Sequence, residues 1–203
     1  MNYSQSNEQE VILNYFGDKI GTFADIGCND CITFSNSRAL ALKGWKGIFV
    51  DPSKAISNCH KLYEGYKGLY IYPYGLSNHN GKDTLYESGA LVSANDQGLV
   101  STMVPSEMDR FKRTVKYEPT EIKVFKWKTF LNRLTIKEFD FISIDVEGAE
   151  LQFLPDMDLS KTSLICLENN GSKELKNKYL NIIWESGLNK VIYESGENII
   201  VSR

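Results

Sequence analysis

Three acidic residues each end a short apolar run of the kind that forms a buried β-strand: Asp51, Asp145 and Glu168. A fourth acid, Asp25, lies just before a glycine turn that ends a similar run. Because the carboxyl ends of parallel strands meet at one edge of a sheet, we expect the four carboxylates to converge there. Carboxylates in such a place can accept hydrogen bonds from a ribose, take a proton from a hydroxyl group or bind a hard cation.

The spacing between the glycine turn and the second acid narrows this chemistry. Residues 22–30 read Thr-Phe-Ala-Asp-Ile-Gly-Cys-Asn-Asp, which is an apolar strand that ends in a turn at Gly27. Asp51 ends the next apolar run. An acid about 20 residues after such a turn is how many α/β proteins hold a ribose. The pattern therefore predicts a nucleoside-binding site that includes the turn and Asp51.

Strands that alternate with helices must position these residues. Strand patterns occur at about 21–27, 46–51, 68–74, 121–126, 139–145, 163–168, 188–194 and 198–202. Helical patterns occur at about 6–17, 34–43, 52–63, 127–134, 148–154 and 173–185. This alternation predicts an α/β fold with a mainly parallel sheet, helices on both faces and an antiparallel strand from the final hairpin.

The segment from about 77 to 117 is the least regular part of the chain. It is rich in Ser, Asn and Gly, and a long irregular segment inside a compact domain commonly carries function. We expect it to form the side of the site away from the nucleoside, where an acceptor molecule would bind. The length of 203 residues fits one domain, residues 1–203, with a full hydrophobic core.

Composition limits the classes of partner. The net charge is −3, which gives no strong attraction to nucleic acid or to an anionic membrane. No apolar run is long enough to cross a bilayer, and the first residues lack the apolar core of a signal peptide. We expect a cytoplasmic protein whose four cysteines are reduced, with no nucleic-acid or membrane partner. The oligomeric state is not indicated.

Cys28 and Cys31 form a C-x-x-C motif in the turn after the first strand. This spacing occurs in redox pairs. A zinc site would need further ligands at suitable spacing, and Cys59, His60 and Cys166 do not supply them. We favour the interpretation that the two cysteines are small residues that line a tight turn.

Three segments closely resemble the FkbM family of S-adenosylmethionine-dependent methyltransferases. They are residues 25–30 (Asp-Ile-Gly-Cys-Asn-Asp), 44–52 (Gly-Trp-Lys-Gly-Ile-Phe-Val-Asp-Pro) and 141–150 (Phe-Ile-Ser-Ile-Asp-Val-Glu-Gly-Ala-Glu). The last segment is the most specific, and the resemblance extends over about residues 20–170. It implies a class I methyltransferase fold, which is a Rossmann-like three-layer sandwich. Its seven-stranded sheet is mostly parallel and its last strand is antiparallel.

This sequence departs from the family pattern at two positions. The family commonly has glycine where Cys31 stands, so the entry into the following helix is expected to differ slightly. It commonly has glutamate where Asp51 stands. Aspartate is one methylene shorter but can still accept hydrogen bonds from both ribose hydroxyls.

The resemblance implies that S-adenosylmethionine occupies the predicted nucleoside site. Asp25 would face the amino-acid end of the cofactor, Gly27 would let the backbone approach it, and Asp51 would bind the ribose. The adenine would lie near Leu76. The full set of predicted cofactor-binding residues is Asp25, Gly27, Cys28, Asn29, Asp51, Pro52, Leu76, Ser77 and Asp145.

Methyl transfer to oxygen requires alignment of donor and acceptor and removal of the hydroxyl proton. Asp145 and Glu147 are the first candidates for the base, and His79 is a third. A metal ion is the alternative. As in catechol O-methyltransferases, Asp145, Glu168 and Asn169 would hold Mg²⁺ or Mn²⁺, which would orient the hydroxyl and lower its pKa.

Members of the family often methylate a hydroxyl group of a sugar or natural product. The resemblance therefore implies a small-molecule or glycan acceptor, such as a deoxyhexose like rhamnose. Two alternatives stay open. One is a nicotinamide-dependent oxidoreductase, although residues 27–31 lack the G-x-G-x-x-G that binds a pyrophosphate. The other is a module that binds the cofactor without catalysis.

Overall fold

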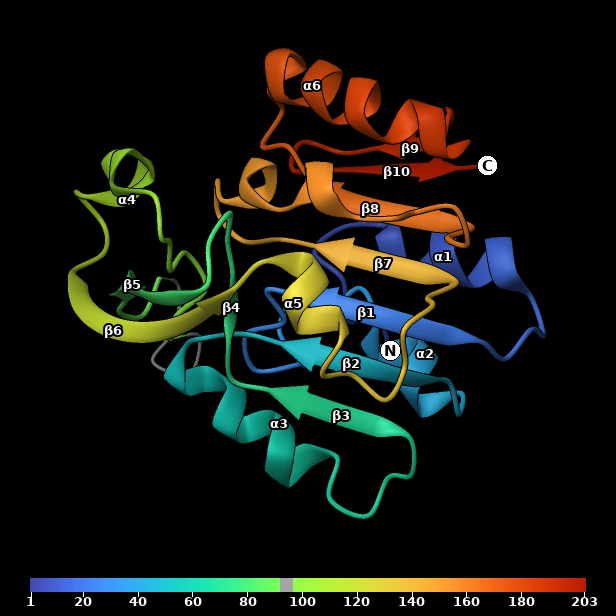
Figure 1. The fold of residues 1–203 in the computed structure, drawn as a ribbon, viewed down its shortest axis with the longest axis horizontal. Helices are drawn as coiled ribbons and strands as arrows, with labels where there is room; N and C mark the ends of the chain where they lie inside the picture. The colour runs from blue at the N-terminus through green and yellow to red at the C-terminus, as the bar shows by residue number, and fades with distance from the viewer. Residues whose placement is uncertain (92–96) are drawn as a thin grey trace.

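The computed structural model describes residues 1–91 and 97–203. Its main sheet has seven strands in the order β3-β2-β1-β7-β8-β10-β9 (Figure 1). Their bounds are β1 (Thr22–Ile26), β2 (Lys46–Val50), β3 (Leu69–Tyr72), β7 (Phe141–Ile144), β8 (Leu164–Glu168), β9 (Lys190–Glu194) and β10 (Asn198–Ser202). β10 runs antiparallel to both of its neighbours, and the other pairs are parallel. The predicted class I methyltransferase fold is confirmed.

Helices cover both faces of the main sheet. The covering helices are α1 (Glu8–Phe16), α2 (Arg38–Leu42), α3 (Ser57–Leu62), α5 (Trp127–Leu131) and α6 (Lys173–Ile183), while α4 (Met108–Phe111) lies beyond the carboxyl ends of the strands (Figure 1). Five short 3₁₀ turns accompany them: η1 (Lys54–Ile56), η2 (Pro105–Glu107), η3 (Glu150–Gln152), η4 (Leu154–Asp156) and η5 (Trp184–Ser186). Within residues 1–91 and 97–203, no helix has the length and apolar character needed to cross a membrane.

Each central strand contributes side chains to two hydrophobic cores. In β1, Phe23 packs with α1, α2 and α3, whereas Ala24 and Ile26 pack with α5, α6 and the 3₁₀ turns. Successive side chains of a strand point to opposite faces, so a strand buried on both faces is mainly apolar, with single polar residues such as Asp25 and Ser143. This explains why the central strands read as continuous apolar runs and not as an alternating pattern.

A second sheet of three strands lies beyond the carboxyl ends of the main strands (Figure 1). It consists of β4 (Gly75–Leu76), β5 (Gly81–Ser88) and β6 (Tyr117–Phe125), in the order β4-β6-β5. The alternating pattern at 121–126 belongs to this sheet, and its apolar side chains Ile122 and Val124 pack against Leu85. The segment predicted as irregular therefore contains β5 and α4, while its residues 92–96 lie outside the described residues.

Two helices are shorter than their sequence patterns predict. The helix expected at 34–43 begins only at Arg38, because Cys31 and Phe34 have left-handed backbone conformations, with φ values of +61° and +56°. The helix expected at 148–154 is replaced by η3 and η4. A left-handed residue interrupts the repeating conformation that a helix needs.

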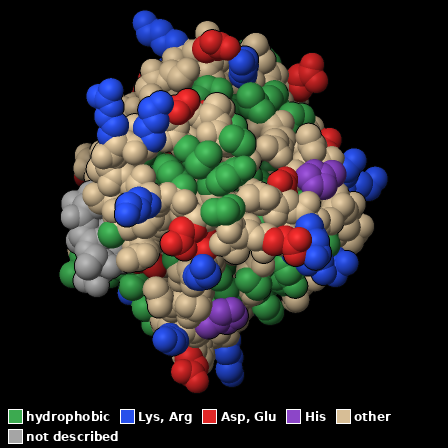
Figure 2. Space-filling model, turned by 90° about the vertical axis from the view of Figure 1, so that its left-hand side faces the viewer, with side chains coloured by type: hydrophobic (Ala, Val, Ile, Leu, Met, Phe, Trp, Pro, Cys, Tyr) green, Lys and Arg blue, Asp and Glu red, His purple; other side chains and the backbone are tan. Residues whose placement is uncertain are grey.

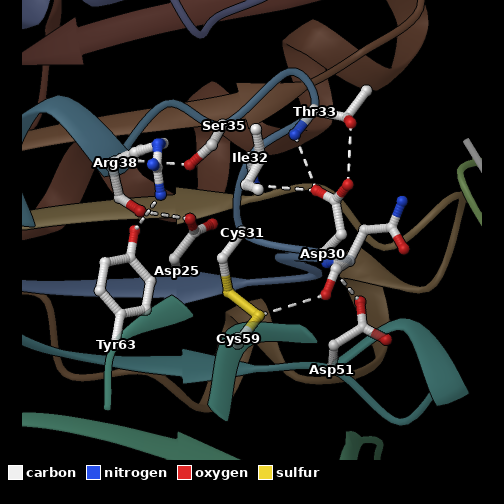
Figure 3. Close-up of a disulfide and its surroundings, with 12 residues drawn as sticks. Asp25, Asp30, Cys31, Ile32, Thr33, Ser35, Arg38, Asp51, Cys59 and Tyr63 are labelled. Atoms are coloured by element: carbon white, nitrogen blue, oxygen red, sulfur yellow. Dashed lines mark hydrogen bonds between the residues drawn. A yellow bond between two sulfur atoms is a disulfide. The ribbon is translucent and has the colours of Figure 1, made fainter. Parts of the chain in front are cut away.

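Cys31 and Cys59 form a disulfide bond, with their Cα atoms 5.6 Å apart (Figure 3). The prediction that all four cysteines are reduced is therefore wrong for this pair, while Cys28 and Cys166 are free and buried. The C-x-x-C spacing places Cys31 near Cys28 in the sequence, but Cys28 is not its disulfide partner. Cys31 pairs with a residue 28 positions later, on α3, which the fold brings beside the turn after β1.

Candidate active site

Two adjoining cavities lie at the carboxyl ends of the central strands. The larger, about 320 Å³, is lined by the turn after β1, the loop before α2, the ends of β7 and β8, and α4. The smaller, about 40 Å³, lies at the end of β2. Gly27 and Ser101 line both cavities, so the two are adjacent. On the face of the molecule at this end, hydrophobic side chains gather near the centre, with charged ones around them (Figure 2).

Residue 27 must be glycine because the ends of β1 and β7 approach each other closely there. Its φ is +85°, and a Cβ atom there would lie 1.6 Å from the carbonyl oxygen of Asp145. Its N–H group donates to the carbonyl oxygen of Val50, at 2.8 Å. We expected glycine so that the backbone could approach a ligand, but the backbone after β7 already excludes any side chain. Gly27 thus sets the distance between the turn and Asp145.

Asp51 is buried, and both of its carboxylate oxygens accept hydrogen bonds from neighbouring residues. One carboxylate oxygen accepts a hydrogen bond from the N–H of Asn29 at 2.9 Å, and the other accepts from the N–H and hydroxyl of Ser53 at 2.8 and 2.5 Å. Burial raises the pKa of Asp51, while these donors oppose the rise. Each carboxylate oxygen has two lone pairs, so Asp51 retains capacity to accept from a ribose.

Asp25 is held in the same manner. Its carboxylate accepts a hydrogen bond from the hydroxyl of Ser37, and the side chain is 5% exposed and lines the larger cavity. Burial raises the pKa of Asp25 to about 7, an effect that Ser37 reduces and the charge of Asp51 increases. A cationic group in the cavity would favour the ionised form of this carboxyl group.

Two asparagines in the larger cavity have side-chain atoms without hydrogen-bond partners. Among the described residues, neither the amide nitrogen nor the amide oxygen of Asn29 has one, and the same holds for the amide oxygen of Asn36. Asn36 is anchored through its nitrogen, which donates to the hydroxyl of Ser143 at 3.2 Å. Since buried polar atoms are almost always paired, these amides indicate that water or a ligand contacts them in the cavity.

A group of three carboxylates lies at the ends of β7 and β8: Asp145, Glu147 and Glu168, hereafter the acidic trio. Carboxylate oxygens of the three lie within 4.8 Å of one another. Burial raises the pKa of Asp145 to about 7 and that of Glu147 to about 8, and neighbouring carboxylates add to both effects. Burial also raises the pKa of Glu168 well above its usual range. At neutral pH the trio therefore binds protons more readily than ordinary carboxylates do.

Arg110 brings a positive charge to the acidic trio. Its guanidinium donates to Glu147 at 3.1 Å and to Glu107 at 3.2 Å, and it opposes the rise in the pKa of Glu147. The hydroxyl of Thr102 donates to the backbone carbonyl of Glu147 at 2.7 Å. These contacts connect the segment between β5 and β6 to the site. In the sequence, Arg110 stands only as part of a basic run at 110–116, which does not indicate its contact with Glu147.

Glu150 stabilises the backbone of residues 146–148, which carries Glu147. Its carboxylate accepts hydrogen bonds from the N–H groups of Val146 and Gly148, at 3.1 and 3.3 Å, and from the hydroxyl of Tyr179 at 3.1 Å. These bonds stabilise a turn in which Glu147 has a φ of +51°. Left-handed non-glycine residues are uncommon and persist only where the surroundings hold them. Glu150 therefore positions Glu147.

The smaller cavity contains several of the residues predicted for adenine. Pro52 and Leu76 line it, together with Asp51, Met103 and Val146. The walls are mainly apolar, which suits a flat aromatic base next to a ribose-binding carboxylate. Met103 was not expected, because it lies in the segment after β5 and nothing in its sequence context marks it.

Three predicted site residues are not brought into either cavity. Ser77 is fully buried and its hydroxyl donates to Gln152 at 2.9 Å. The ring of His79 lies 3.1 Å from that hydroxyl and otherwise contacts its own loop. Asn169 is buried, and its backbone N–H donates to the carbonyl of Glu197 at 2.7 Å. None of the three lines either cavity, so their expected roles stay predictions.

Sequence comparison identifies one family. A model of the family described as "Methyltransferase FkbM domain" matches residues 25–191, which is most of the chain. None of the curated proteins gives a significant match.

Solved structures share the fold. One is a putative RNA methyltransferase, PH1948, from Pyrococcus horikoshii, with 12% identity, a TM-score of 0.51, and coverage of 97% of this chain and 83% of that chain. Another is the ribosomal protein L11 methylase from Lactobacillus delbrueckii subsp. bulgaricus, with 12% identity, a TM-score of 0.53, and coverage of 100% and 80%. At this identity the likeness shows the fold alone.

Proposed function

Since the chain belongs to the FkbM methyltransferase family, we propose that it transfers a methyl group from S-adenosylmethionine to a hydroxyl oxygen of a sugar or small natural product. The family assignment makes the chain an S-adenosylmethionine-dependent methyltransferase. The observation that carries the choice of oxygen is the acidic trio, whose carboxylates lie together beside the larger cavity. A hydroxyl group must lose its proton during transfer, and these are the groups that can receive it.

The donor fits the two adjoining cavities. Its adenine suits the narrow apolar cavity, and its ribose hydroxyls would be accepted by Asp51. Its amino-acid end would then extend past Gly27 to Asp25 and to the unpaired amides of Asn29 and Asn36. In this arrangement the positively charged amino group of the donor would lie beside Asp25 and favour its ionised form.

The transfer step is an in-line displacement. The acceptor oxygen forms a bond to the methyl carbon, the carbon–sulfur bond breaks, and the bonding electrons leave with the sulfur, which becomes a neutral thioether. The hydroxyl proton passes to Asp145 or Glu147. Their raised pKa values, about 7 and 8, make them better proton acceptors than an ordinary carboxylate near physiological pH.

A divalent metal ion would suit the same carboxylates. Asp145, Glu147 and Glu168 provide the hard oxygen ligands that Mg²⁺ or Mn²⁺ prefers, with oxygens close enough to share one ion. Glu147 takes the place that we predicted for Asn169, which does not line the cavity. Such an ion would polarise the acceptor hydroxyl and lower its pKa.

The walls of the larger cavity favour a sugar over a flat apolar acceptor. Leu99, Val100 and Phe111 supply apolar surface, while Arg110 and Glu197 supply charge. A sugar ring presents apolar C–H faces and polar edges, so it can use both kinds of wall. A deoxyhexose such as rhamnose, whose methyl group adds apolar surface, would use them well.

A transfer assay with radiolabelled S-adenosylmethionine tests this proposal. The acceptors would be a panel of glycosides and small phenols, with matched amines and thiols as controls for oxygen specificity. We expect label on a glycoside hydroxyl. Label only on nitrogen or sulfur acceptors would overturn the proposal. Parallel assays in EDTA test the metal: loss of transfer that Mg²⁺ or Mn²⁺ restores supports it, and full activity in EDTA excludes it.

A further inference from the structure

Three cysteines gather directly behind the predicted cofactor site. The sulfur atoms of Cys28, Cys31 and Cys59 lie within 4.8 Å of one another, and Cys31 and Cys59 are bonded. Cys31 and Cys59 are fully buried, whereas Cys28 is 5% exposed and lines the larger cavity. The proposed methyl-transfer chemistry uses none of these sulfur atoms, so the cluster requires a separate explanation.

The disulfide joins the two segments that hold the ribose-binding acid. Cys31 lies in the turn after β1, and Cys59 lies on α3, which follows Asp51 in the chain. Between them, the N–H of Asn29 donates to Asp51, and the carbonyl oxygen of Asn29 lies 3.5 Å from the sulfur of Cys59 (Figure 3). The covalent bond therefore fixes the same turn that supplies a hydrogen bond to Asp51.

The backbone at Cys31 shows that this turn needs support. Its φ of +61° lies in the left-handed region, which is unfavourable for a residue that has a side chain. Glycine, which the family commonly has here, would adopt this conformation without that cost. A cysteine in its place is disfavoured by the backbone and retained by the bond to Cys59. Breaking the bond would leave the turn free to relax toward conformations that suit cysteine better.

We propose that Cys31 and Cys59 form a redox modification site, and that breaking their bond weakens binding of S-adenosylmethionine. The proposal rests on the proposed function for the identity of the ligand. The reductant is a dithiol. One of its thiolates attacks a sulfur of the Cys31–Cys59 bond and expels the other cysteine as a thiolate. Its second thiol then displaces the first cysteine. The dithiol is oxidised to a cyclic disulfide, and two cysteine thiols are formed by uptake of two electrons and two protons.

Cys28 does not rearrange this bond by itself. Burial raises the pKa of its thiol well above the usual range, and the charges of Asp51 and Asp25 add to the effect. The thiolate is the form that attacks disulfides, so a protonated Cys28 leaves the Cys31–Cys59 pairing intact. Neither bonded sulfur is exposed, so reduction requires the turn to open. A bound cofactor that holds the turn opposes this opening.

Ligand binding and reduction of the Cys31–Cys59 bond are therefore linked, and the same factor must describe the effect of each on the other. If reduction raises the dissociation constant of a ligand by some factor, the ligand must shift the reduction equilibrium by the same factor. Two independent measurements can thus test one number. The probe is S-adenosylhomocysteine, the demethylated product, because it occupies the site without reacting.

Isothermal titration calorimetry would give the dissociation constant of S-adenosylhomocysteine for the oxidised chain and for the chain reduced with dithiothreitol. We expect an increase of about tenfold on reduction, which corresponds to about 1.4 kcal/mol. Alkylation and mass spectrometry in dithiothreitol redox buffers would give the reduced fraction with and without the probe. We expect the probe to shift that equilibrium about tenfold toward the disulfide.

Two controls separate the disulfide from other effects of a thiol reagent. The Cys31→Ala/Cys59→Ala variant should bind like the reduced wild type and should not respond to dithiothreitol. A phosphine reductant, which leaves no adduct on Cys28, should reproduce the effect in the wild type. Equal affinity of the oxidised and reduced chains, within twofold, would overturn this inference alone. Absence of binding in both states would overturn the proposed function as well.

Discussion

The two groups of carboxylates in the site are built in different ways. On the donor side, Asp25 accepts a hydrogen bond from Ser37 at the start of α2, and Asp51 accepts from Asn29 in the turn after β1 and from Ser53 in the loop after β2. On the acceptor side, the members of the acidic trio face one another, and Arg110 is the cation that donates to Glu147. The donor side is thus ready to bind in the free protein. The acceptor side is electrostatically unsatisfied until a proton, a cation or a substrate enters.

This difference suggests a division of labour. Carboxylates with backbone and hydroxyl donors keep their position, which suits the repeated binding of one invariant cofactor. Carboxylates that repel one another respond to what is added, which suits proton transfer. Substitutions on the donor side should therefore act mainly on affinity for the cofactor, and substitutions on the acceptor side mainly on the rate of transfer.

The largest expected effect comes from the acceptor side. Asp145→Asn removes a candidate base without changing its shape, so the transfer rate should fall about 100- to 10,000-fold. The dissociation constant of S-adenosylhomocysteine should change much less. Asp140→Asn is the matched control, because Asp140 precedes β7 where Asp145 follows it, and its partners are Lys19 and Thr22. Single-turnover assays and calorimetry would measure both. A rate within threefold of wild type for Asp145→Asn would contradict the comparison.

On the donor side, Asp51→Asn should weaken binding of S-adenosylhomocysteine by about 10- to 100-fold. The ribose would lose a charged acceptor, and hydrogen bonds to charged groups contribute about 1.5–3 kcal/mol. At saturating cofactor the transfer rate should stay within a few fold of wild type. Calorimetry and saturation kinetics test this. A low rate with unchanged affinity would show that the two sides do not divide the work.

A moderate effect is expected on the pH dependence. If a carboxylate of the trio accepts the proton, kcat/KM should rise with pH through about 7–8, because Asp145 and Glu147 must be ionised. Arg110→Ala removes the charge that favours ionised Glu147, so the rise should move upward by about one pH unit if Glu147 is the base. Arg113→Ala, in the same basic patch, is the control and should leave the profile unchanged. An unchanged profile in Arg110→Ala would exclude Glu147 as the base.

The smallest expected effect is on stability. Carboxyl groups of the unfolded chain lose their protons at about pH 4, whereas in the folded protein Asp25, Asp145 and Glu147 have raised pKa values of about 7, 7 and 8. Between these pH values the folded protein therefore holds more protons than the unfolded chain. The free energy of unfolding should therefore fall as the pH rises through this window. We expect a Tm at least about 3 °C lower at pH 8 than at pH 5.5. Scanning calorimetry tests this, and a Tm that rises with pH would contradict it.

The main sheet could be predicted from the sequence because its strands are buried on both faces. Continuous apolar runs such as 141–144 and 164–167 have few alternatives in a chain of alternating elements. The small sheet could not be predicted in the same way. Its strand β6 shows an alternating pattern that indicates a half-buried strand but not the sheet to which it belongs. Partners such as β5 are set by tertiary contacts.

For the candidate site, residues at strand ends were predictable and residues outside them were not. Asp51 and Asp145 follow from their place after an apolar run. Arg110 reaches the site because the segment between β5 and β6 folds back over the strand ends, and no local pattern records that path. The Cys31–Cys59 bond was missed for the same reason, since its partners lie on different elements. His79 lies near the rim, but its described contacts are with Ser77 and its own loop, so its role stays a prediction.

The placement of β10 between β8 and β9 has a consequence for the order in which the chain folds. β9 pairs only with β10 in the described structure, so it cannot join the main sheet before β10 has formed. β9 therefore enters the sheet together with β10 or after it, and β10 itself needs β8 as a partner. The tip of the C-terminal hairpin that β9 and β10 form carries Glu197, whose carbonyl oxygen accepts from Asn169 and Asn170. Glu197 also lines the larger cavity, so one wall of that cavity depends on the C-terminal hairpin being in place.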